Sequence, residues 1–185
     1  MQPLSFTPFP ELKTDTLLLR RLRTSDAPEL YFLRSDDTVL LYLGRDKEKS
    51  VETAAAFIEK INKAIDNNES ILWGIALFDQ PDHLIGSICL WQFQPENSRC
   101  EIGYVLHPSH WGKGLMKEAA AEVIQYGTNV LGLHTMEAHI NPGNIASGRL
   151  LQSLGFEKEG HLRENYYYNG EYSDTVVFGK ILKKV

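Results

Sequence analysis

The chain has 185 residues, of which 43% are hydrophobic, and its 24 acidic and 19 basic side chains give a formal net charge of −5. A chain of this length buries enough surface to fold without a disulfide or metal, and we expect a single domain over residues 1–185. The acidic balance argues against a nucleic-acid partner, because such proteins normally present a basic face. No apolar stretch approaches the roughly 20 residues that cross a bilayer, so no membrane partner is expected.

The two cysteines, Cys89 and Cys100, are expected to be free thiols. The N-terminus has no basic segment followed by an apolar stretch and a cleavage site, which is the pattern of a secreted protein. Because disulfides are rare in the cytosol, these features together predict a cytoplasmic protein with reduced cysteines.

The first third of the chain predicts one strand and two helices. Residues 16–22 are β-branched and leucine-rich and end at Thr24-Ser25-Asp26, a helix-capping cluster. After a mixed segment over residues 34–49, apolar residues recur at spacings of three and four over residues 51–65, behind Ser50 as a cap. A strand, a helix and a second helix are therefore expected in that order.

The middle of the chain predicts an antiparallel meander. Its three strand-like runs cover residues 71–79, 84–93 and 100–106. Gln80-Pro81-Asp82 and residues 94–97 separate them and have turn chemistry.

The last third of the chain alternates helices and strands. The expected elements are a long amphipathic helix over residues 116–131, a strand over 133–140, a helix capped by Asn141-Pro142 and ended by Gly155, and two strands from 156 and over 175–182 around an Asn169-Gly170 turn. The whole order predicts a mixed α/β fold. We expect a central, mostly antiparallel sheet of about seven strands with helices on both faces, in which the fourth strand, the long helix and the fifth strand form a right-handed crossover.

The strongest chemical signal is the passage from Glu101 to Met116, where a strand runs into the glycine loop Gly112-Lys113-Gly114 and then a helix. Unpaired backbone N–H groups and the positive end of the helix dipole converge at such a point, which favours a phosphate. A Walker loop is excluded because His107 and Leu115 stand where glycine and Ser/Thr are needed, and a Rossmann loop because Lys117 replaces its third glycine. The glycines alone would equally allow a plain tight turn.

A second polar element, Asn144 and Ser147, places two side chains three residues apart on one helix face. With it, the chain resembles the GNAT superfamily of acetyl-coenzyme A dependent N-acetyltransferases, most closely the branch that acetylates N-terminal amines of ribosomal proteins. The resemblance rests on Leu17-Leu18-Leu19-Arg20-Arg21-Leu22, Glu101-Ile102-Gly103-Tyr104, Trp111-Gly112-Lys113-Gly114, Asn144-Ile145-Ala146-Ser147, Leu154-Gly155-Phe156 and Asn169-Gly170-Glu171-Tyr172-Ser173-Asp174.

The resemblance implies acetyl-CoA as co-substrate and a set of residues that hold it. The chain departs from the family's pyrophosphate loop at Trp111 and Met116, so backbone amides from Gly112 to Met116 would do most of the phosphate binding, and Lys113 would either add a point charge or remain a solvated surface lysine. The expected cofactor-binding residues are Tyr104, Val105, Leu106, Trp111, Gly112, Lys113, Gly114, Leu115, Met116, Asn141, Asn144 and Ser147. No metal is expected, because His107, His110 and His139 show no zinc-site spacing.

Two residues are expected to be catalytic. Glu101 shares a strand face with Gly103 and Val105 and matches a position where family members carry a catalytic glutamate; the alternative is a solvated carboxylate. Ser147 would protonate the departing thiolate, unless it is only a small packing residue. Tyr166, Tyr167 and Tyr168 are rival acids. Backbone N–H groups over residues 104–106 would stabilise the oxyanion and bind pantetheine.

The expected reaction is acetyl transfer from acetyl-CoA to a primary amine, most plausibly the N-terminal α-amine of a protein. Residues 35–49 and the hairpin over residues 163–172, with Glu164 and Glu171, would recognise the acceptor. A polyamine, an aminoglycoside or another small amine is the alternative acceptor, and a coenzyme A binding module without turnover is the alternative function. A homodimer is possible, although no apolar stripe demands one.

Overall fold

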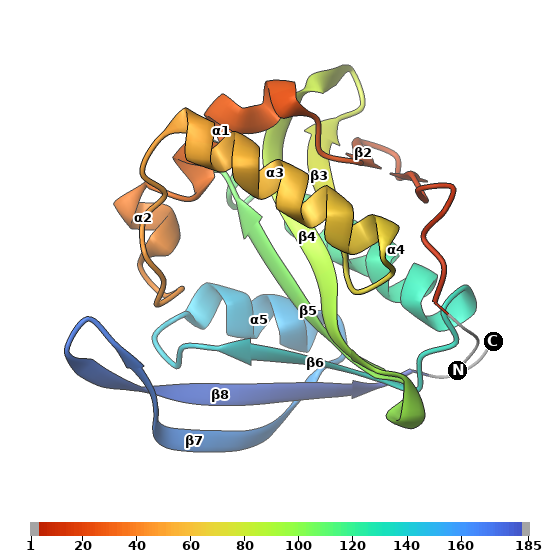
Figure 1. Ribbon diagram of the computed structural model, residues 1–185. Helices are drawn as coiled ribbons and strands as arrows, with labels where there is room; N and C mark the ends of the chain where they lie inside the picture. The colour runs from red at the N-terminus through yellow and green to blue at the C-terminus, as the bar shows by residue number, and fades with distance from the viewer. Residues whose placement is uncertain (1–3, 183–185) are drawn as a thin grey trace.

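The computed structural model describes residues 4–182 and is built around one eight-stranded sheet (Figure 1). Its elements are β1 (Leu12–Lys13), β2 (Leu17–Arg20), α1 (Ala27–Leu33), α2 (Asp37–Leu40), α3 (Val51–Asp66), β3 (Ile71–Leu77), β4 (Gln80–Gln94), β5 (Arg99–Leu106), α4 (Leu115–Asn129), β6 (Thr135–Ile140), α5 (Ile145–Ser153), β7 (Glu157–Tyr168) and β8 (Glu171–Ile181). The strand order is β1-β2-β3-β4-β5-β6-β8-β7. Neighbouring strands pair antiparallel, except that β5 and β6 are parallel.

The mixed, mostly antiparallel sheet with helices on its faces confirms the predicted fold class. The sheet has one strand more than the seven expected, because β1 is only two residues long and leaves no alternation to detect. The four-residue helix α2 was also missed, within the segment that showed no clear period. The parallel pair β5 and β6 with α4 between them is the crossover connection that the order of elements predicts.

The helices cover the two faces of the sheet, as Figure 1 shows, with α1 and α3 across one face and α4 on the other. Leu30 of α1 and Ile58 of α3 pack with Leu84 of β4 in one buried cluster. Val123 of α4 and Leu151 of α5 belong to a second, larger cluster with the opposite face of the strands. Because alternate residues of a strand face opposite ways, neighbouring residues of β5 point to different helix layers.

A buried ion pair connects β2 to the beginning of α1. Arg20 and Asp26 are each about 1% exposed, and two hydrogen bonds of 2.8 and 2.7 Å join them. Arg20 also donates to the backbone oxygen of Pro81, and Asp26 accepts from the backbone N–H of Arg23. Both buried charges are therefore paired and hydrogen-bonded, which is the condition for a stable buried ion pair.

The turn between β3 and β4 lies earlier than the sequence predicts. It consists of Phe78 and Asp79, and β4 begins at Gln80, so the expected turn at Gln80-Pro81-Asp82 is wrong. Pro81 lies in the extended strand, where it cannot donate a ladder hydrogen bond. The β3–β4 register shifts on either side of Ala76, which accommodates the irregular end of the hairpin.

Cys89 and Cys100 are both free thiols, as expected. Across residues 4–182, every helix is too short or too polar to span a membrane.

Candidate active site

The central feature of the site is a gap between β5 and β6. Their register joins only Arg99–Glu101 to Thr135–Glu137. Beyond these residues the strands diverge, as Figure 1 shows, while β5 stays paired with β4 as far as Leu106. The β6-facing backbone groups of residues 102–106 therefore have no strand partner in the described sheet. An extended ligand rich in amides can bind such an edge like an added strand.

A glycine loop follows β5 and leads into α4. Gly112 and Gly114 have positive φ angles of 73° and 79°, which a side chain would strain. Gly114 is the N-cap of α4 and no side chain caps this end within the described residues. The first α4 hydrogen bond of the backbone runs from Glu118 N–H to Gly114 O, so the preceding N–H groups of the first turn remain free. This arrangement can bind an anion.

Trp111 supports this loop. Its indole N–H donates to the backbone oxygen of Leu106 at 2.7 Å, which joins the loop to the end of β5. The side chain therefore holds the backbone in place, in agreement with the expectation that Trp111 does not replace a phosphate-binding arginine.

A cleft of about 610 Å³ begins at the glycine loop and follows the gap, and we call it the donor cleft. Of the residues predicted to bind the cofactor, it is lined by Tyr104, Val105, Leu106, Trp111, Gly112, Gly114, Leu115, Met116, Asn144 and Ser147. Lys113 is exposed and does not line it, which agrees with the solvated alternative. The cation that lines the cleft is Lys117, in the first turn of α4, which the sequence reasoning used only to exclude a Rossmann loop.

The helix expected after Asn141-Pro142 begins three residues later than predicted. Asn144, not Asn141, is the N-cap of α5, and its side-chain oxygen accepts from Ser147 N–H at 3.0 Å. The Asn141 side chain instead accepts from Gly143 N–H within the preceding turn. The prediction failed because an Asx turn and a helix cap use the same residue types. The amide NH₂ of Asn144 has no hydrogen-bond partner among the described residues and can donate to a ligand.

Ser147 contacts Tyr104 across the donor cleft. The two hydroxyl oxygens lie 2.7 Å apart, and Ser147 is buried. Burial raises the pKa of Tyr104 to about 12, although the hydrogen bond with Ser147 lowers it, so the phenol is protonated at neutral pH. The two residues therefore form a pair of proton-bearing groups. From the sequence, Tyr104 is predicted only to bind the cofactor, because its contact with Ser147 depends on the docking of α5 against β5.

A second cavity of about 670 Å³ adjoins the donor cleft, and we call it the acceptor cavity. The two share Tyr42, Leu43, Tyr104, Val105, Asn144 and Ser147. The acceptor cavity extends under α1 and α3 to Glu101, and Asn141 lines it. Its other wall includes Tyr42, Leu43 and Arg45, so the segment over residues 35–49 contributes to the cavity as expected. Two cavities that meet at the gap can hold two reactants side by side.

Glu101 is a buried carboxylate in the acceptor cavity, 6% exposed. Its Oε2 has no hydrogen-bond partner in the described structure. Burial raises the pKa of Glu101 above its ordinary value, whereas the charge of His139 and a hydrogen bond from Trp91 lower it. A carboxylate with a raised pKa that faces a cavity is suited to accept a proton.

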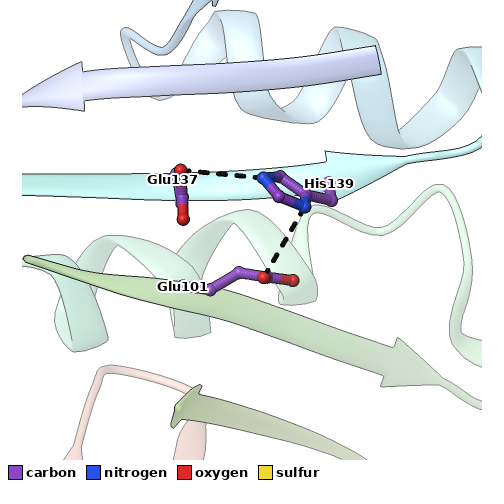
Figure 2. Close-up of side chains that lie close together, drawn as sticks. All are labelled: Glu101, Glu137 and His139. Atoms are coloured by element: carbon purple, nitrogen blue, oxygen red, sulfur yellow. Dashed lines mark ion pairs between the residues drawn. The ribbon is translucent and has the colours of Figure 1, made fainter. Parts of the chain in front are cut away.

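Figure 2 shows His139 between two carboxylates from neighbouring strands. Its Nδ1 lies 3.8 Å from Glu101, its Nε2 lies 3.6 Å from Glu137, and Glu137 also pairs with Arg99. The three potential ligand atoms lie within 4.8 Å of one another. The ion pairs account for this cluster, so it does not change the expectation of no metal. Glu137 was missed because only the parallel register places it beside Glu101.

The three rival tyrosines lie on the β7–β8 hairpin. Tyr166 donates its hydroxyl to Gly44 O, and Tyr167 packs on Tyr172. These tyrosines, Tyr166, Tyr167 and Tyr168, line neither the donor cleft nor the acceptor cavity. Glu164 and Glu171 also lie outside both linings, and their expected contact with the acceptor stays a prediction.

A family model described as an acetyltransferase (GNAT) domain matches residues 16–157. The chain belongs to the GNAT acetyltransferase family. The uncharacterized N-acetyltransferase YoaA of Bacillus subtilis is 38% identical over 170 residues, which are 92% of this chain and 96% of that protein. The ribosomal protein uS5-alanine N-acetyltransferase of Escherichia coli is 29% identical over 184 residues, with coverage of 94% and 91%.

The fold of this GNAT protein is also found in solved structures. The spermidine N-acetyltransferase from Vibrio cholerae, in complex with CoA and spermine, aligns with a TM-score of 0.80 at 24% identity, covering 92% of this chain and 98% of that one. Every residue that lines the two cavities lies within the matched GNAT domain. The chain is therefore an acetyl-CoA-dependent N-acetyltransferase.

Proposed function

We propose that this GNAT enzyme acetylates the N-terminal α-amine of a protein, with Glu101 as the general base. The observation that carries the proposal is the position of Glu101: its carboxylate is buried, has an unpartnered oxygen and faces a cavity that joins the donor cleft. An amine that reaches this cavity would meet a proton acceptor next to the gap between β5 and β6.

The donor would lie along the gap with its diphosphate at the glycine loop. The free N–H groups from Gly112 to Met116 would bind the diphosphate, with Lys117 adding positive charge. The pantetheine amides would pair with the free edge of β5, and the amide of Asn144 would contact the same arm. This arrangement brings the thioester to the point where the two cavities meet.

The reaction would begin with deprotonation of the acceptor. An α-amine has a pKa of about 7.7–8.0 and arrives largely protonated at neutral pH. Glu101 would accept this proton, directly or through one water, and the free amine would attack the thioester carbon. His139 is partly exposed and lies 3.8 Å from Glu101, so it offers the proton a route to solvent.

Collapse of the tetrahedral intermediate would complete the transfer. Backbone N–H groups on the β5 edge, over residues 104–106, would stabilise the oxyanion. The C–S bond then breaks and the thiolate takes a proton from the Tyr104–Ser147 pair, which the second nitrogen proton restores, directly or through water. The products are the acetamide, CoA thiol and one released proton.

The identity of the acceptor rests on the charge of the acceptor cavity. Glu69 and Glu101 in its lining are matched by Arg34 and Arg45, so it is not the acidic pocket that a polyamine would require. The similarity to the uS5-alanine N-acetyltransferase supports a protein N-terminus, and the free cysteines agree with the cytoplasmic location that such an acceptor requires. A cavity of about 670 Å³ also has the size of a small-molecule site, which keeps a small amine as the second candidate.

An acceptor screen distinguishes these functions. The protein is titrated with acetyl-CoA, and thiol release is then measured with peptides that begin with Ala or Ser, with spermidine and with an aminoglycoside. We expect the peptides to give the highest kcat/KM. Faster thiol release with spermidine or the aminoglycoside would favour the small-amine function, and binding without thiol release for any amine would indicate a non-catalytic module.

The role of Glu101 is tested by Glu101→Gln, with Glu59→Gln as the matched control on the exposed side of α3. We expect Glu101→Gln to lower kcat by about 10²–10⁴-fold. The wild-type rate should rise with pH through the raised pKa of Glu101, and this limb should disappear in Glu101→Gln. If both variants keep the wild-type pH profile, Glu101 is not the base.

A further inference from the structure

The acceptor cavity contains a cation whose buried donors have no hydrogen-bond partner among the described residues. Arg45 lines it, and its Nε and Nη2 atoms are buried with no hydrogen-bond partner among the described residues. Burial, with a smaller contribution from Arg34, lowers the pKa of Arg45 to about 10, so the guanidinium is charged at neutral pH. A buried charge is normally paired, because leaving water costs several kcal/mol.

No neighbouring charged side chain among the described residues hydrogen-bonds to the buried Nε and Nη2 of Arg45. Glu48 accepts from Arg34 at 3.0 Å, and the Arg34 guanidinium stacks on the Phe57 ring at 3.7 Å. Glu101 accepts from Trp91 and lies beside His139. Among the described residues that line this cavity, Arg45 is therefore the cation with buried donors that have no hydrogen-bond partner. A planar guanidinium in this state is suited to a carboxylate or a phosphate, which it can bind through two parallel hydrogen bonds.

The segment that carries Arg45 is held in place from both sides. On one side, Tyr166 of β7 donates to the backbone oxygen of Gly44. On the other, Lys47 pairs with Asp37 at 2.6 Å, and the backbone N–H of Glu48 donates to Arg34 O at 2.8 Å. The backbone on both sides of Arg45 is thus held before a ligand arrives, which reduces the entropy lost on binding.

Arg45 and Glu101 both line the acceptor cavity, together with Cys89. Cys89 of β4 pairs with Gly103 of β5, and a Cβ on Gly103 would lie only 3.2 Å from the Cys89 sulfur. Burial is the main reason why the pKa of the Cys89 thiol is raised to about 12; a hydrogen bond from the Gly103 backbone and the charge of Arg45 oppose this shift, whereas the charge of Glu101 adds to it. One ligand bound in this cavity can therefore contact both charged groups.

We propose that the acceptor is an amine that also carries an anionic group, which pairs with Arg45 while the amine meets Glu101. The inference rests on the proposed function and narrows its substrate class. For a protein acceptor, it calls for an acidic residue directly after the N-terminal one. It excludes polyamines, because a second cationic centre would lie against the buried guanidinium.

Matched acceptors test the proposal. The first arm uses peptides that differ only at position two, with Glu, Gln or Lys after an N-terminal Ala. The second arm uses small ω-amino acids and their carboxamides of equal length. Comparison of the two arms shows whether Arg45 binds the anionic group of a peptide or of a small molecule. We expect the acidic acceptor of at least one arm to exceed its neutral partner by about 10–100-fold in kcat/KM, the effect of a charged hydrogen bond.

Variants at Arg45 assign this preference to one side chain. Arg45→Gln should lose it, Arg45→Lys should keep part of it, and Arg45→Glu should favour the Lys peptide. Arg23→Gln is the control, because Arg23 is exposed, pairs with Asp82 and lies outside both cavities. The melting temperature and the acetyl-CoA-induced shift of each variant show whether it is folded and binds the donor.

The possible results lead to different conclusions. An acidic preference that Arg45→Gln abolishes and Arg23→Gln retains supports the proposal. Wild-type turnover without an acidic preference, or a preference that Arg45→Gln retains, overturns it and leaves the proposed acetyl transfer intact. Acetyl-CoA binding without thiol release for any amine overturns the proposed function and this inference together.

Discussion

Gly114→Ala tests the glycine loop, and Gly132→Ala is its matched control. A Cβ at Gly114 would have no protein atom within 4 Å, so the methyl group causes no clash and only the backbone at φ +79° is strained. Gly132 has φ +66°, equally open surroundings and no contact with either cavity. A left-handed conformation costs an alanine about 1–2 kcal/mol. Both variants should therefore lose the same stability in the absence of ligand.

The difference between the variants should appear when acetyl-CoA is added. A methyl group at Gly114 would occupy space beside the free N–H groups of α4. Losing a hydrogen bond to the charged diphosphate costs about 1.5–3 kcal/mol, or about 10–100-fold in Kd. At a ligand concentration of about 100 times the wild-type Kd, acetyl-CoA stabilises the protein by about 2.7 kcal/mol. A variant whose Kd for acetyl-CoA is about 100-fold higher keeps only about 0.4 kcal/mol of this stabilisation.

Thermal unfolding with and without acetyl-CoA measures both effects. Without ligand, Tm should fall by about 2–4 °C per kcal/mol in each variant. With ligand, Gly132→Ala should recover the full wild-type shift and Gly114→Ala only a small part of it. A full shift in Gly114→Ala would refute the assignment of the diphosphate to this loop.

Three further predictions concern other parts of the structure. Ser147→Ala should lower kcat by about tenfold or more with little change in acetyl-CoA binding. Tyr104→Phe added to Ser147→Ala should lower kcat little further, because the two hydroxyls act as a pair. Thiol-release kinetics and ligand titration measure this, and an unchanged kcat would exclude the pair as acid. Asp26→Asn should lower the free energy of unfolding by about 3–5 kcal/mol in urea titrations, because Arg20 stays buried without a counter-charge; a loss below about 1 kcal/mol would contradict this. Glu101→Gln should stabilise the protein at neutral pH. Because the pKa of Glu101 is raised, the stability of the wild type falls as pH rises from about 4.5 through that pKa. The stability gained by Glu101→Gln over the wild type should therefore grow across this pH range and vanish below it. A gain that is the same at every pH would point to packing instead.

The parts of the site that depend on local sequence could be predicted. The glycine loop was found because Gly112 and Gly114 stand directly between a strand and a helix, and the positive φ angles there need glycine. The orientation of Glu101 followed from strand alternation, and the structure indeed places its side chain in the cavity beside Gly103.

The parts that depend on tertiary contacts could not be predicted. Glu137 reaches His139 only through the register of two parallel strands, and no sequence pattern specifies that register. Arg45 lies in a segment without periodicity whose position depends on contacts with the distant hairpin residue Tyr166. The N-cap of α5 was misplaced from Asn144 to Asn141, because both residues make capping-type hydrogen bonds and only the backbone distinguishes them.

The gap between β5 and β6 also bears on the kinetic order of the reaction. Glu101 and Tyr104 point to opposite faces of β5, so the acceptor would approach from the layer of α1 and α3 and the thioester from the layer of α4 and α5. Neither molecule would block the other's path, and the acetyl group would cross the sheet in one encounter. A sheet opened in this way would allow a ternary complex, in which the amine attacks the thioester without an acetylated enzyme.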